Sequence, residues 1–439
     1  MLGFLRPVPA VPAYAGRPRG TTSRQRGVRL ARAIAALCAL GAAAPAAWGS
    51  MPGARAPVPA PARIEQFETE KQIPKADRAA IFEDYVRVFR AEFERGEFAS
   101  ALALAERATR LYPQLRRPWN HTAAARTRLL RWGPAIEAAR FADRARDDED
   151  RPAPVPEESA AGAAYWEGLA LYSTQRYSEA LPRLHAAAAR NPLWAEAQRA
   201  LAECVFVSGK AADAAPLYAR AFELDPTQGT TRDLSYFAEA RAATGDVEGG
   251  VAALQEALQR APFEPGLHAK LGDLYRRGSR PVEAYYELLY EILLHGPQSR
   301  FAAPALSMQS ELVKAATQTR QDPASEEIIL VAGSLRSVQD NQLHDALHKL
   351  QLAQRDSRAA SPVPQFLFAD AEERAGLHDK ARTTLQALVG AYPGFAPALF
   401  LLSDVETAAG RPQAAERALQ RLRDAFPGYW KLQAKAADE

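Results

Sequence analysis

The sequence contains few of the residues and patterns on which most catalytic, metal-binding and membrane-spanning proteins depend. Only two of its 439 residues are cysteines, Cys38 and Cys204, which excludes a disulfide framework. It has no glycine-rich phosphate-binding loop after a strand-like segment, and runs of residues typical of strands are scarce. With 24% charged and 47% hydrophobic residues, the composition favours a soluble helical chain.

The first 64 residues contain no Asp, Glu or Lys but nine arginines. The apolar run at residues 33–47 is shorter than the about 20 residues that cross a membrane, and it contains Pro45. A basic segment, a short apolar core and small residues before Ser50 predict an export signal over residues 1–49. A retained N-terminal anchor and an organelle transit peptide are the alternatives. We therefore expect a periplasmic or secreted protein, or periplasmic repeats held by a membrane anchor.

Removing this leader changes the charge balance. The whole chain has a formal net charge of +3, and seven arginines precede Ser50, so the remainder carries −4. This balance argues against nucleic acid as a partner. The segment 50–76 begins with many prolines and alanines, and we expect it to be a linker.

A helical hairpin is indicated most clearly in residues 161–194. A small residue at Gly168 and another at Ala187 would let two antiparallel helices pack closely. Tyr177 would begin the second helix, and Pro192 would end it because proline cannot continue an α-helix. This spacing resembles the tetratricopeptide repeat, a helix hairpin with a period of about 34 residues.

The same spacing returns along the chain, with proline at the closing position of six copies. The resemblance implies an all-α fold, a right-handed superhelical solenoid of antiparallel helix hairpins with about nine repeats. We expect one lobe of six repeats over 77–298, an irregular helical spacer at 299–326, a lobe of three repeats over 327–429 and a tail at 430–439. The nine repeats are expected at 82–115, 116–149, 161–194, 195–228, 231–264, 265–298, 327–360, 362–395 and 396–429.

The resemblance also implies where a partner would bind. In this family the first helix of each repeat lines a concave groove, and its outward positions contact a peptide or helix of another protein. Carried over to this sequence, those positions are Val86, Arg90, Phe93, Tyr165, Leu169, Tyr172, Arg199, Glu203, Phe206, Arg232, Asp273, Arg276, Phe366, Asp370 and Phe400. The alternative is that Tyr165, Leu169 and Tyr172 pack on the adjacent repeat. If they line the groove, replacing Tyr165 and Tyr172 with alanine weakens partner capture and leaves helicity intact.

Candidates for catalysis are weak. His344 and His348 in the segment HDALH have the spacing of a zinc-protease motif, but Asp345 replaces the glutamate of that motif and no third ligand is evident. Cys204 is expected to be a buried, unreactive thiol. We therefore expect no catalytic residue, no metal and no cofactor.

The sequence thus predicts a non-enzymatic scaffold for protein–protein interaction that holds a partner segment in its groove. Envelope proteins with such repeats suggest a role in a bacterial envelope assembly or export system. The alternative is a non-catalytic subunit that presents substrate within an enzyme complex. No residue identifies the partner.

Overall fold

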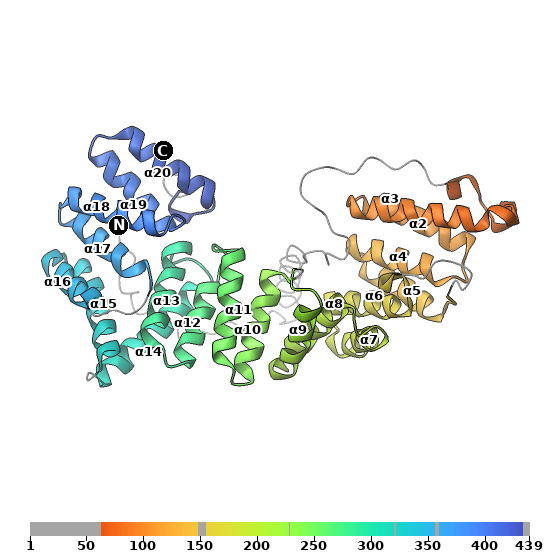
Figure 1. Ribbon diagram of the computed structural model, residues 1–439, viewed down its shortest axis with the longest axis horizontal. Helices are drawn as coiled ribbons and strands as arrows, with labels where there is room; N and C mark the ends of the chain where they lie inside the picture. Colours follow the sequence, from red (N-terminus) through yellow and green to blue (C-terminus); the bar gives the residue numbers. More distant parts are fainter. Residues whose placement is uncertain (1–62, 148–154, 228, 320–321, 356–359, 433–439) are drawn as a thin grey trace, which may run out of the picture. The chain divides into compact units, whose positions relative to one another are not determined.

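The computed structural model describes residues 63–147, 155–227, 229–319, 322–355 and 360–432. Within these ranges the chain consists of α-helices joined by short turns, without any β-strand (Figure 1). The predicted all-α fold of helix hairpins is therefore confirmed, while the handedness of a superhelix and the number of repeats stay predictions. The predicted leader lies outside the described residues. No helix within them is both long and apolar enough to cross a membrane.

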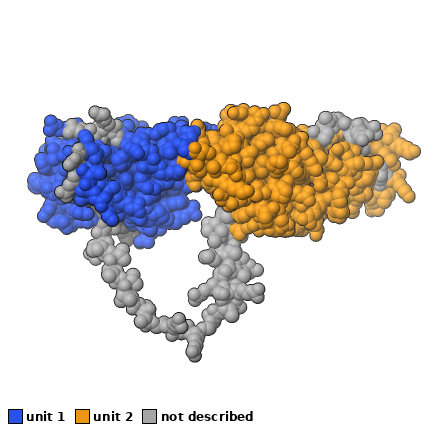
Figure 2. Space-filling model, turned by 90° about the horizontal axis from the view of Figure 1, so that it is seen from below, with its two compact units in different colours: residues 1–16, 245–439 blue, residues 17–244 orange. Residues whose placement is uncertain are grey.

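Two compact units divide the chain, with the boundary between Thr244 and Gly245 (Figure 2). We call described residues 63–244 the N-unit and described residues 245–432 the C-unit. The boundary lies inside the predicted repeat 231–264 and not in the predicted spacer 299–326, so the proposed division into six-repeat and three-repeat lobes stays a prediction.

The N-unit is a series of helix hairpins in which each helix packs on the next one in the chain. Its hairpins are α2/α3, α4/α5, α6/α7 and α8/α9, followed by α10. The α-helices are α2 (Arg78–Glu94), α3 (Phe98–Leu111), α4 (Arg116–Arg128), α5 (Trp132–Arg144), α6 (Ala160–Ser173), α7 (Tyr177–Arg190), α8 (Ala195–Val207), α9 (Ala211–Leu224) and α10 (Thr231–Ala243). Short 3-10 helices are η1 (Arg63–Gln66), η2 (Glu70–Gln72), η3 (Lys75–Asp77) and η4 (Pro156–Glu158).

The described part of the predicted linker, residues 63–76, is not an extended spacer. Ile64 and Ile73 are buried in the core of the N-unit. The guanidinium of Arg107 on α3 donates hydrogen bonds to the carbonyl oxygens of Ile64 and Phe67. The linker prediction was wrong for this part because the proline-rich composition ends before it and apolar side chains begin.

The C-unit contains four hairpins, together with α11 and one helix that has no hairpin partner, α14. Its helices are α11 (Val247–Arg260), α12 (Leu267–Arg277), α13 (Pro281–His295), α14 (Ala302–Thr319), α15 (Pro323–Gln339), α16 (Leu343–Arg355), α17 (Val363–Arg374), α18 (His378–Ala391), α19 (Ala396–Ala408) and α20 (Pro412–Ala425). The hairpin α12/α13 is followed by α14, which packs on both α13 and α15, and then by α15/α16, α17/α18 and α19/α20. Helix α14 thus lies in the predicted spacer and interrupts the series of hairpins.

The turns between paired helices share one backbone feature, a residue with positive φ. Positive φ is the conformation that ends a helix and lets the chain reverse. Several successive turns are 34 residues apart, so the period read from the sequence is also present in the backbone. The turn residues are Gly96, Leu130, Gln175, Gly209, Gly245, Ser279, Asn341, Gly376 and Gly410.

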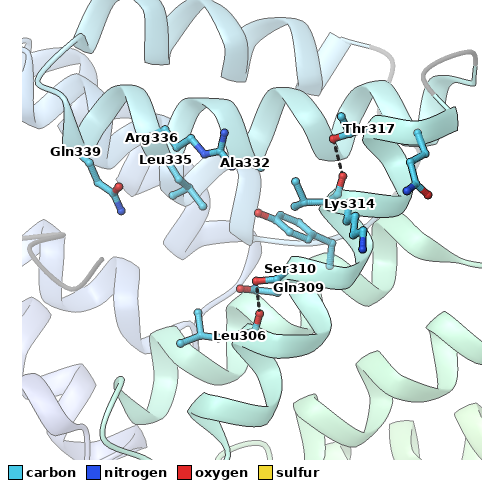
Figure 3. Close-up of a pocket in the computed structure, with 12 residues that line it drawn as sticks. Leu306, Gln309, Ser310, Lys314, Thr317, Ala332, Leu335, Arg336 and Gln339 are labelled. Carbon is cyan, nitrogen blue, oxygen red and sulfur yellow. Dashed lines mark hydrogen bonds between the residues drawn. The ribbon is translucent and has the colours of Figure 1, made fainter. Parts of the chain in front are cut away.

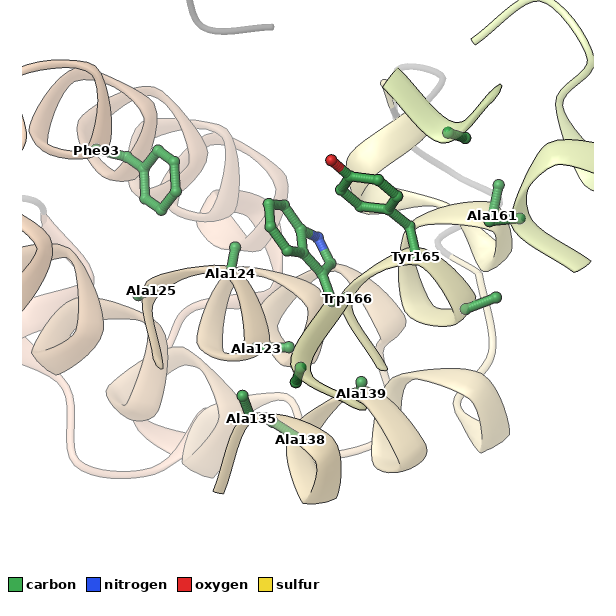
Figure 4. Packing of buried hydrophobic residues seen from close by; sticks show 14 of the residues in the cluster. Phe93, Ala123, Ala124, Ala125, Ala135, Ala138, Ala139, Ala161, Tyr165 and Trp166 are labelled. Atoms are coloured by element: carbon green, nitrogen blue, oxygen red, sulfur yellow. The ribbon is translucent and has the colours of Figure 1, made fainter. Parts of the chain in front are cut away.

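Small residues allow the two helices of a hairpin to approach closely. A Cβ added to Gly168 of α6 would lie 2.7 Å from Cγ of Leu184 on α7, and one added to Gly272 of α12 would lie 2.9 Å from Cγ of Leu288 on α13. In the α4/α5 hairpin, the small residues at the interface between the two helices are alanines. Figure 4 shows the buried Ala123, Ala124 and Ala125 of α4 and Ala135, Ala138 and Ala139 of α5.

The C-unit closes on itself, because α13 contacts α17 and α19 in addition to its hairpin partner. The ring centroids of Tyr290 on α13 and Phe395 before α19 are 5.0 Å apart. Trp430, after α20, donates its indole N–H to the carbonyl oxygen of Leu293 at 3.1 Å. The rings of Phe263 and Phe426 stack with their centroids 4.6 Å apart. Phe426 and Trp430 are thus fixed on Phe263, which follows α11, and on α13.

The close approach of α12 and α13 can be tested at Gly272. Gly272→Ala is expected to lower the free energy of unfolding of the C-unit by about 1–3 kcal/mol, because the added methyl group overpacks against Leu288 and the carbonyl oxygen of Ala284. Gly390→Ala on α18 is the matched control, since a Cβ there meets nothing within 4 Å and helix propensity should raise stability by up to about 1 kcal/mol. Urea unfolding followed by circular dichroism measures both. Equal stability of the two variants would contradict the close approach.

Candidate functional site

The predicted groove residues do not form one exposed surface. Val86, Phe93, Tyr165, Phe366 and Phe400 are only 3%, 5%, 2%, 2% and 6% exposed. Their side chains pack inside the two units and offer no exposed surface at these positions, so their contact with a partner stays a prediction.

In the N-unit this filling involves rings from neighbouring hairpins. The ring of Tyr165 on α6 lies 4.5 Å from the ring of Trp194, which precedes α8, and 5.0 Å from Trp166 in an edge-to-face arrangement (Figure 4). Phe93 on α2 packs edge-to-face on Phe98 of α3 at 5.1 Å. Of the two interpretations of Tyr165 left open by the sequence, the structure supports packing on the adjacent repeat.

In the C-unit the predicted groove positions are buried by the closure of the unit. Phe366 on α17 packs edge-to-face on Phe395, with the ring centroids 5.6 Å apart, and Phe395 also contacts Tyr290 of α13. Phe400 on α19 lies against Tyr429 near the chain end, with Nζ of Lys431 5.5 Å from its ring centroid. The surface expected to receive a partner is therefore occupied by the unit itself.

Arg90, another predicted contact, belongs to a buried polar cluster centred on Glu158 of η4. Arg90 donates two hydrogen bonds to Oε1 of Glu158, at 2.7 and 3.0 Å, and Nε of Arg117 lies 3.3 Å from Oε2. His121 donates from Nε2 to the same carboxylate at 2.9 Å, and its Nδ1 accepts the hydroxyl proton of Tyr85 at 2.6 Å. The cluster joins α2 and α4 to the segment that precedes α6.

Burial and hydrogen bonding set the charges of this cluster. Burial lowers the pKa of His121, which leaves its imidazole neutral at pH 7 and able to accept from Tyr85 while donating to Glu158. Burial alone would raise the pKa of Glu158, but the hydrogen bond from His121 and the positive charge of Arg90 lower that pKa well below its ordinary value. Glu158 is therefore ionised and paired, and the cluster has a structural role.

A row of partly exposed apolar side chains remains on the N-unit, which we call the aromatic strip: Leu169, Tyr172, Phe206 and Tyr236. They come from α6, α8 and α10, the first helices of three consecutive hairpins in the predicted scheme. The rings of Phe206 and Tyr236 stack with their centroids 4.6 Å apart and their planes 22° apart. The strip is therefore continuous from α8 to α10.

Charged groups border and fix the strip. The hydroxyl of Tyr172 donates to Oε1 of Glu203 at 2.9 Å, and Nη2 of Arg232 lies 3.0 Å from the same oxygen. Nε of Arg199 lies 3.7 Å from Oδ2 of Asp233. Burial raises the pKa of Glu203, and the positive charge of Arg232 partly offsets that shift. Tyr172, Glu203 and Arg232 thus connect α6, α8 and α10 through polar contacts.

The remaining predicted contacts belong to the C-unit and pair locally. Asp273 and Arg276 form an ion pair of 2.6 Å on α12, and Asp370 and Arg374 form one of 2.7 Å on α17. Of the predicted groove residues, those that lie in or beside the aromatic strip are therefore Leu169, Tyr172, Arg199, Glu203, Phe206 and Arg232.

Two important residues were missing from the sequence-based set. Tyr236 was missed because it is the sixth residue of the predicted repeat 231–264, and the sixth position is not among the outward positions carried over from the family. Glu158 was missed because it lies in a proline-containing segment between two predicted repeats. The signal available for Glu158 was the pair of adjacent carboxylates directly before a strongly apolar helix.

Groups with possible chemistry are few in the described part of the chain. His344 and His348 are exposed on α16, and no group of three or more His, Cys, Asp or Glu residues suited to a metal ion is found in the described ranges. Burial raises the pKa of Cys204 to about 11, so its thiol stays protonated.

Comparison with known proteins identifies the repeat. Residues 165–228 and 374–436 each match a family model described as tetratricopeptide repeat. The first match extends from α6 to the end of α9, and the second from the end of α17 through α20. Two segments of the chain, one in each unit, are therefore tetratricopeptide repeats. Such repeats serve as protein–protein interaction scaffolds and are typically non-catalytic.

Solved tetratricopeptide-repeat proteins resemble parts of this chain. YrrB, described as having an unusual peptide-binding site, is 17% identical, with a TM-score of 0.32, over 47% of this chain and 94% of its own. A thermophilic protein from Thermus thermophilus, TTC0263, is 20% identical, with a TM-score of 0.32, over 44% of this chain and 98% of its own. A protein from Parabacteroides merdae is 12% identical, with a TM-score of 0.33, over 66% and 98%. No curated protein sequence matches this chain.

Tyr165 and Tyr172 should now respond differently to substitution. Tyr165→Ala is expected to lower the free energy of unfolding of the N-unit by about 3 kcal/mol, because it removes a buried ring from between α6 and Trp194. Tyr172→Phe removes only the hydroxyl that donates to Glu203 and is expected to cost about 1 kcal/mol. Thermal unfolding followed by circular dichroism compares them. Full stability of the Tyr165→Ala variant would contradict the core position of this ring.

The Glu158 cluster can be tested by removing one charge. Glu158→Gln is expected to lower the free energy of unfolding of the N-unit by about 3 kcal/mol, because the buried guanidinium of Arg117 loses its buried carboxylate partner and keeps only the more distant, exposed carboxylate of Glu83. Glu179→Gln is the control, since Glu179 pairs with Arg176 on the surface and its loss should have no measurable effect. Chemical denaturation at pH 7 measures both variants. A Glu158→Gln variant as stable as the control would show that the cluster contributes little.

Proposed function

We propose that the N-unit holds a segment of a partner protein along the aromatic strip, and that the chain acts as a non-enzymatic scaffold. The observation that carries the proposal is the row of partly exposed side chains on α6, α8 and α10, in which Phe206 stacks on Tyr236 and Tyr172 is hydrogen-bonded to Glu203 of α8. Aromatic side chains give large contact area at low cost in conformational entropy, because few torsion angles must be fixed. The proposed binding surface is thus limited to three helices and is shorter than the groove predicted from the sequence.

Fixed polar groups beside the strip would orient the bound segment. Arg232 is held by Glu203, and its Nε is buried without a hydrogen-bond acceptor among the described residues. A buried donor without an acceptor costs free energy, which a backbone carbonyl of the bound segment would recover. Because Tyr172 and Glu203 are already held in place, binding would require little rearrangement on this side.

We further propose that this scaffold works in a bacterial envelope assembly or export system. The support is the acid-free, arginine-rich start of the chain with its short apolar run, which is typical of an export signal. The competing function is that of a non-catalytic subunit presenting substrate to an enzyme. The two differ in the identity of the protein that the strip captures.

Site-specific photo-crosslinking tests both parts of the proposal. Replacing Phe206 or Tyr236 with p-benzoylphenylalanine in the host cell is expected to give a discrete adduct with one partner protein, found in the envelope fraction. Leu193, which is 72% exposed and precedes α8, is the matched control position and should give no such adduct. An adduct with an enzyme supports the competing function.

The contradicting outcomes are distinct. The absence of an adduct at both strip positions, or an identical adduct from Leu193, would refute binding at the strip. An adduct confined to the cytoplasmic fraction would refute the envelope location and leave the strip intact as a binding surface.

A further inference from the structure

A cleft in the C-unit, bordered by α14 and α15, has the chemistry of a binding site that is independent of the aromatic strip. Its volume is about 560 Å³, and residues of both helices line it, with Tyr285 of α13 (Figure 3). Helix α14 packs on both α13 and α15, and it is the helix that lies between two hairpins.

The apolar part of the lining consists of side chains at helical spacing. Leu306 and Val313 on α14 are seven residues apart, and Ala332 and Leu335 on α15 are three apart, so each pair lies on one face of its helix. These side chains provide an apolar surface for residues of a bound segment. Around them lie hydroxyl and amide groups, among them Ser310, Thr317, Gln318 and Gln339.

The charges of the lining are all of one sign. Lys314 on α14 and Arg336 on α15 are exposed, and no lining residue is acidic. Neither cation forms an ion pair with a described residue, whereas many other arginines of the chain pair with Asp or Glu. The cleft therefore offers two positive charges, one on each bordering helix.

One buried polar group in the cleft also lacks a partner. Gln309 is 7% exposed, and its Nε2 has no hydrogen-bond acceptor among the described residues. Burying an amide donor without an acceptor is unfavourable, so a ligand that brings an oxygen atom to this position would gain free energy. Tyr285 also lines the cleft, and its phenol hydroxyl provides a second donor.

We propose that the α14/α15 cleft binds an acidic amphipathic segment of a partner protein. Apolar residues of the segment would pack on Leu306, Val313 and Leu335, and its carboxylates would pair with Lys314 and Arg336. Gln309 would donate to an oxygen of the bound segment. Charge complementarity favours an acidic occupant. A basic segment would bring like charges together, and a neutral segment would leave the two cations unpaired.

Fluorescence anisotropy with the purified full chain tests the proposal. The probe is a fluorescein-labelled Glu/Leu peptide of about 16 residues, long enough for about four helical turns. Its comparison peptides are a version with Lys in place of each Glu and a scramble of the same composition. The Glu/Leu peptide is expected to bind, and its affinity should decrease when NaCl is raised from about 50 to about 500 mM, because salt screens the exposed charges.

Charge reversal identifies the site. The double variant Lys314→Glu with Arg336→Glu is expected to bind the Glu/Leu peptide at least roughly tenfold more weakly, and to gain affinity for the Lys version. The matched control changes two exposed basic residues outside the cleft, Lys210→Glu with Arg421→Glu, and should bind like the wild type. Gain of Lys-peptide binding distinguishes a changed site from a misfolded one, which would bind neither peptide.

Three results would overturn the proposal. One is a wild-type chain that binds the Glu/Leu and Lys peptides equally, and another is an equal loss of binding in the control variant. The third is a dimer in sedimentation velocity that only the cleft variant abolishes, because a second copy then covers the cleft. Photo-crosslinking at Phe206 in the cleft variant should be unchanged, so failure here leaves the proposed function of the strip intact.

Discussion

The close approach of two helices within each hairpin is the constraint on which the rest of this structure depends. Gly168 and Gly272 leave no room for a Cβ against the leucine opposite, and alanines occupy the same interface in the α4/α5 hairpin. Because glycine or alanine lies opposite the facing helix at these interfaces, aromatic rings pack elsewhere in the unit, for example between hairpins. Rings such as Tyr165 and Trp194 therefore form the core between neighbours, and fewer rings remain for a partner.

The surface left for a partner differs between the units for this reason. In the N-unit, Tyr172 and Phe206 lie at the end of their helices, away from the centre of the interface, and stay partly exposed. In the C-unit, α13 contacts α17 and α19, and Phe366 and Phe400 are enclosed. Equivalent positions in one repeat family thus have different environments, and the predicted contact positions are partly exposed in some repeats and buried in others.

Much of the local structure could be predicted from the sequence, because it depends on short-range signals. Proline at the closing position and small residues at the interface indicate where a helix ends and where two helices touch, and α6 and α7 follow those signals closely. Burial at the predicted groove positions could not be predicted, because it depends on contacts between residues far apart in the chain. Tyr290 with Phe395 and Arg90 with Glu158 are pairs of this kind. The packing of Ile64 and Ile73 was missed because residues 50–76 were treated as one linker. The prolines are concentrated in the first part of that segment, and apolar side chains that pack in the core follow them.

The bond from Trp430 to Leu293 also bears on how the C-unit loses its structure. In an open array of repeats each hairpin contacts only its neighbours, so the terminal hairpin can fray while the others stay folded. Here the last turn of chain is attached to α13, and fraying from that end would also expose the Tyr290 and Phe395 rings. The helices from α12 to α20 are thereby coupled into one cooperative segment, in which the terminal hairpin does not act as a detachable cap.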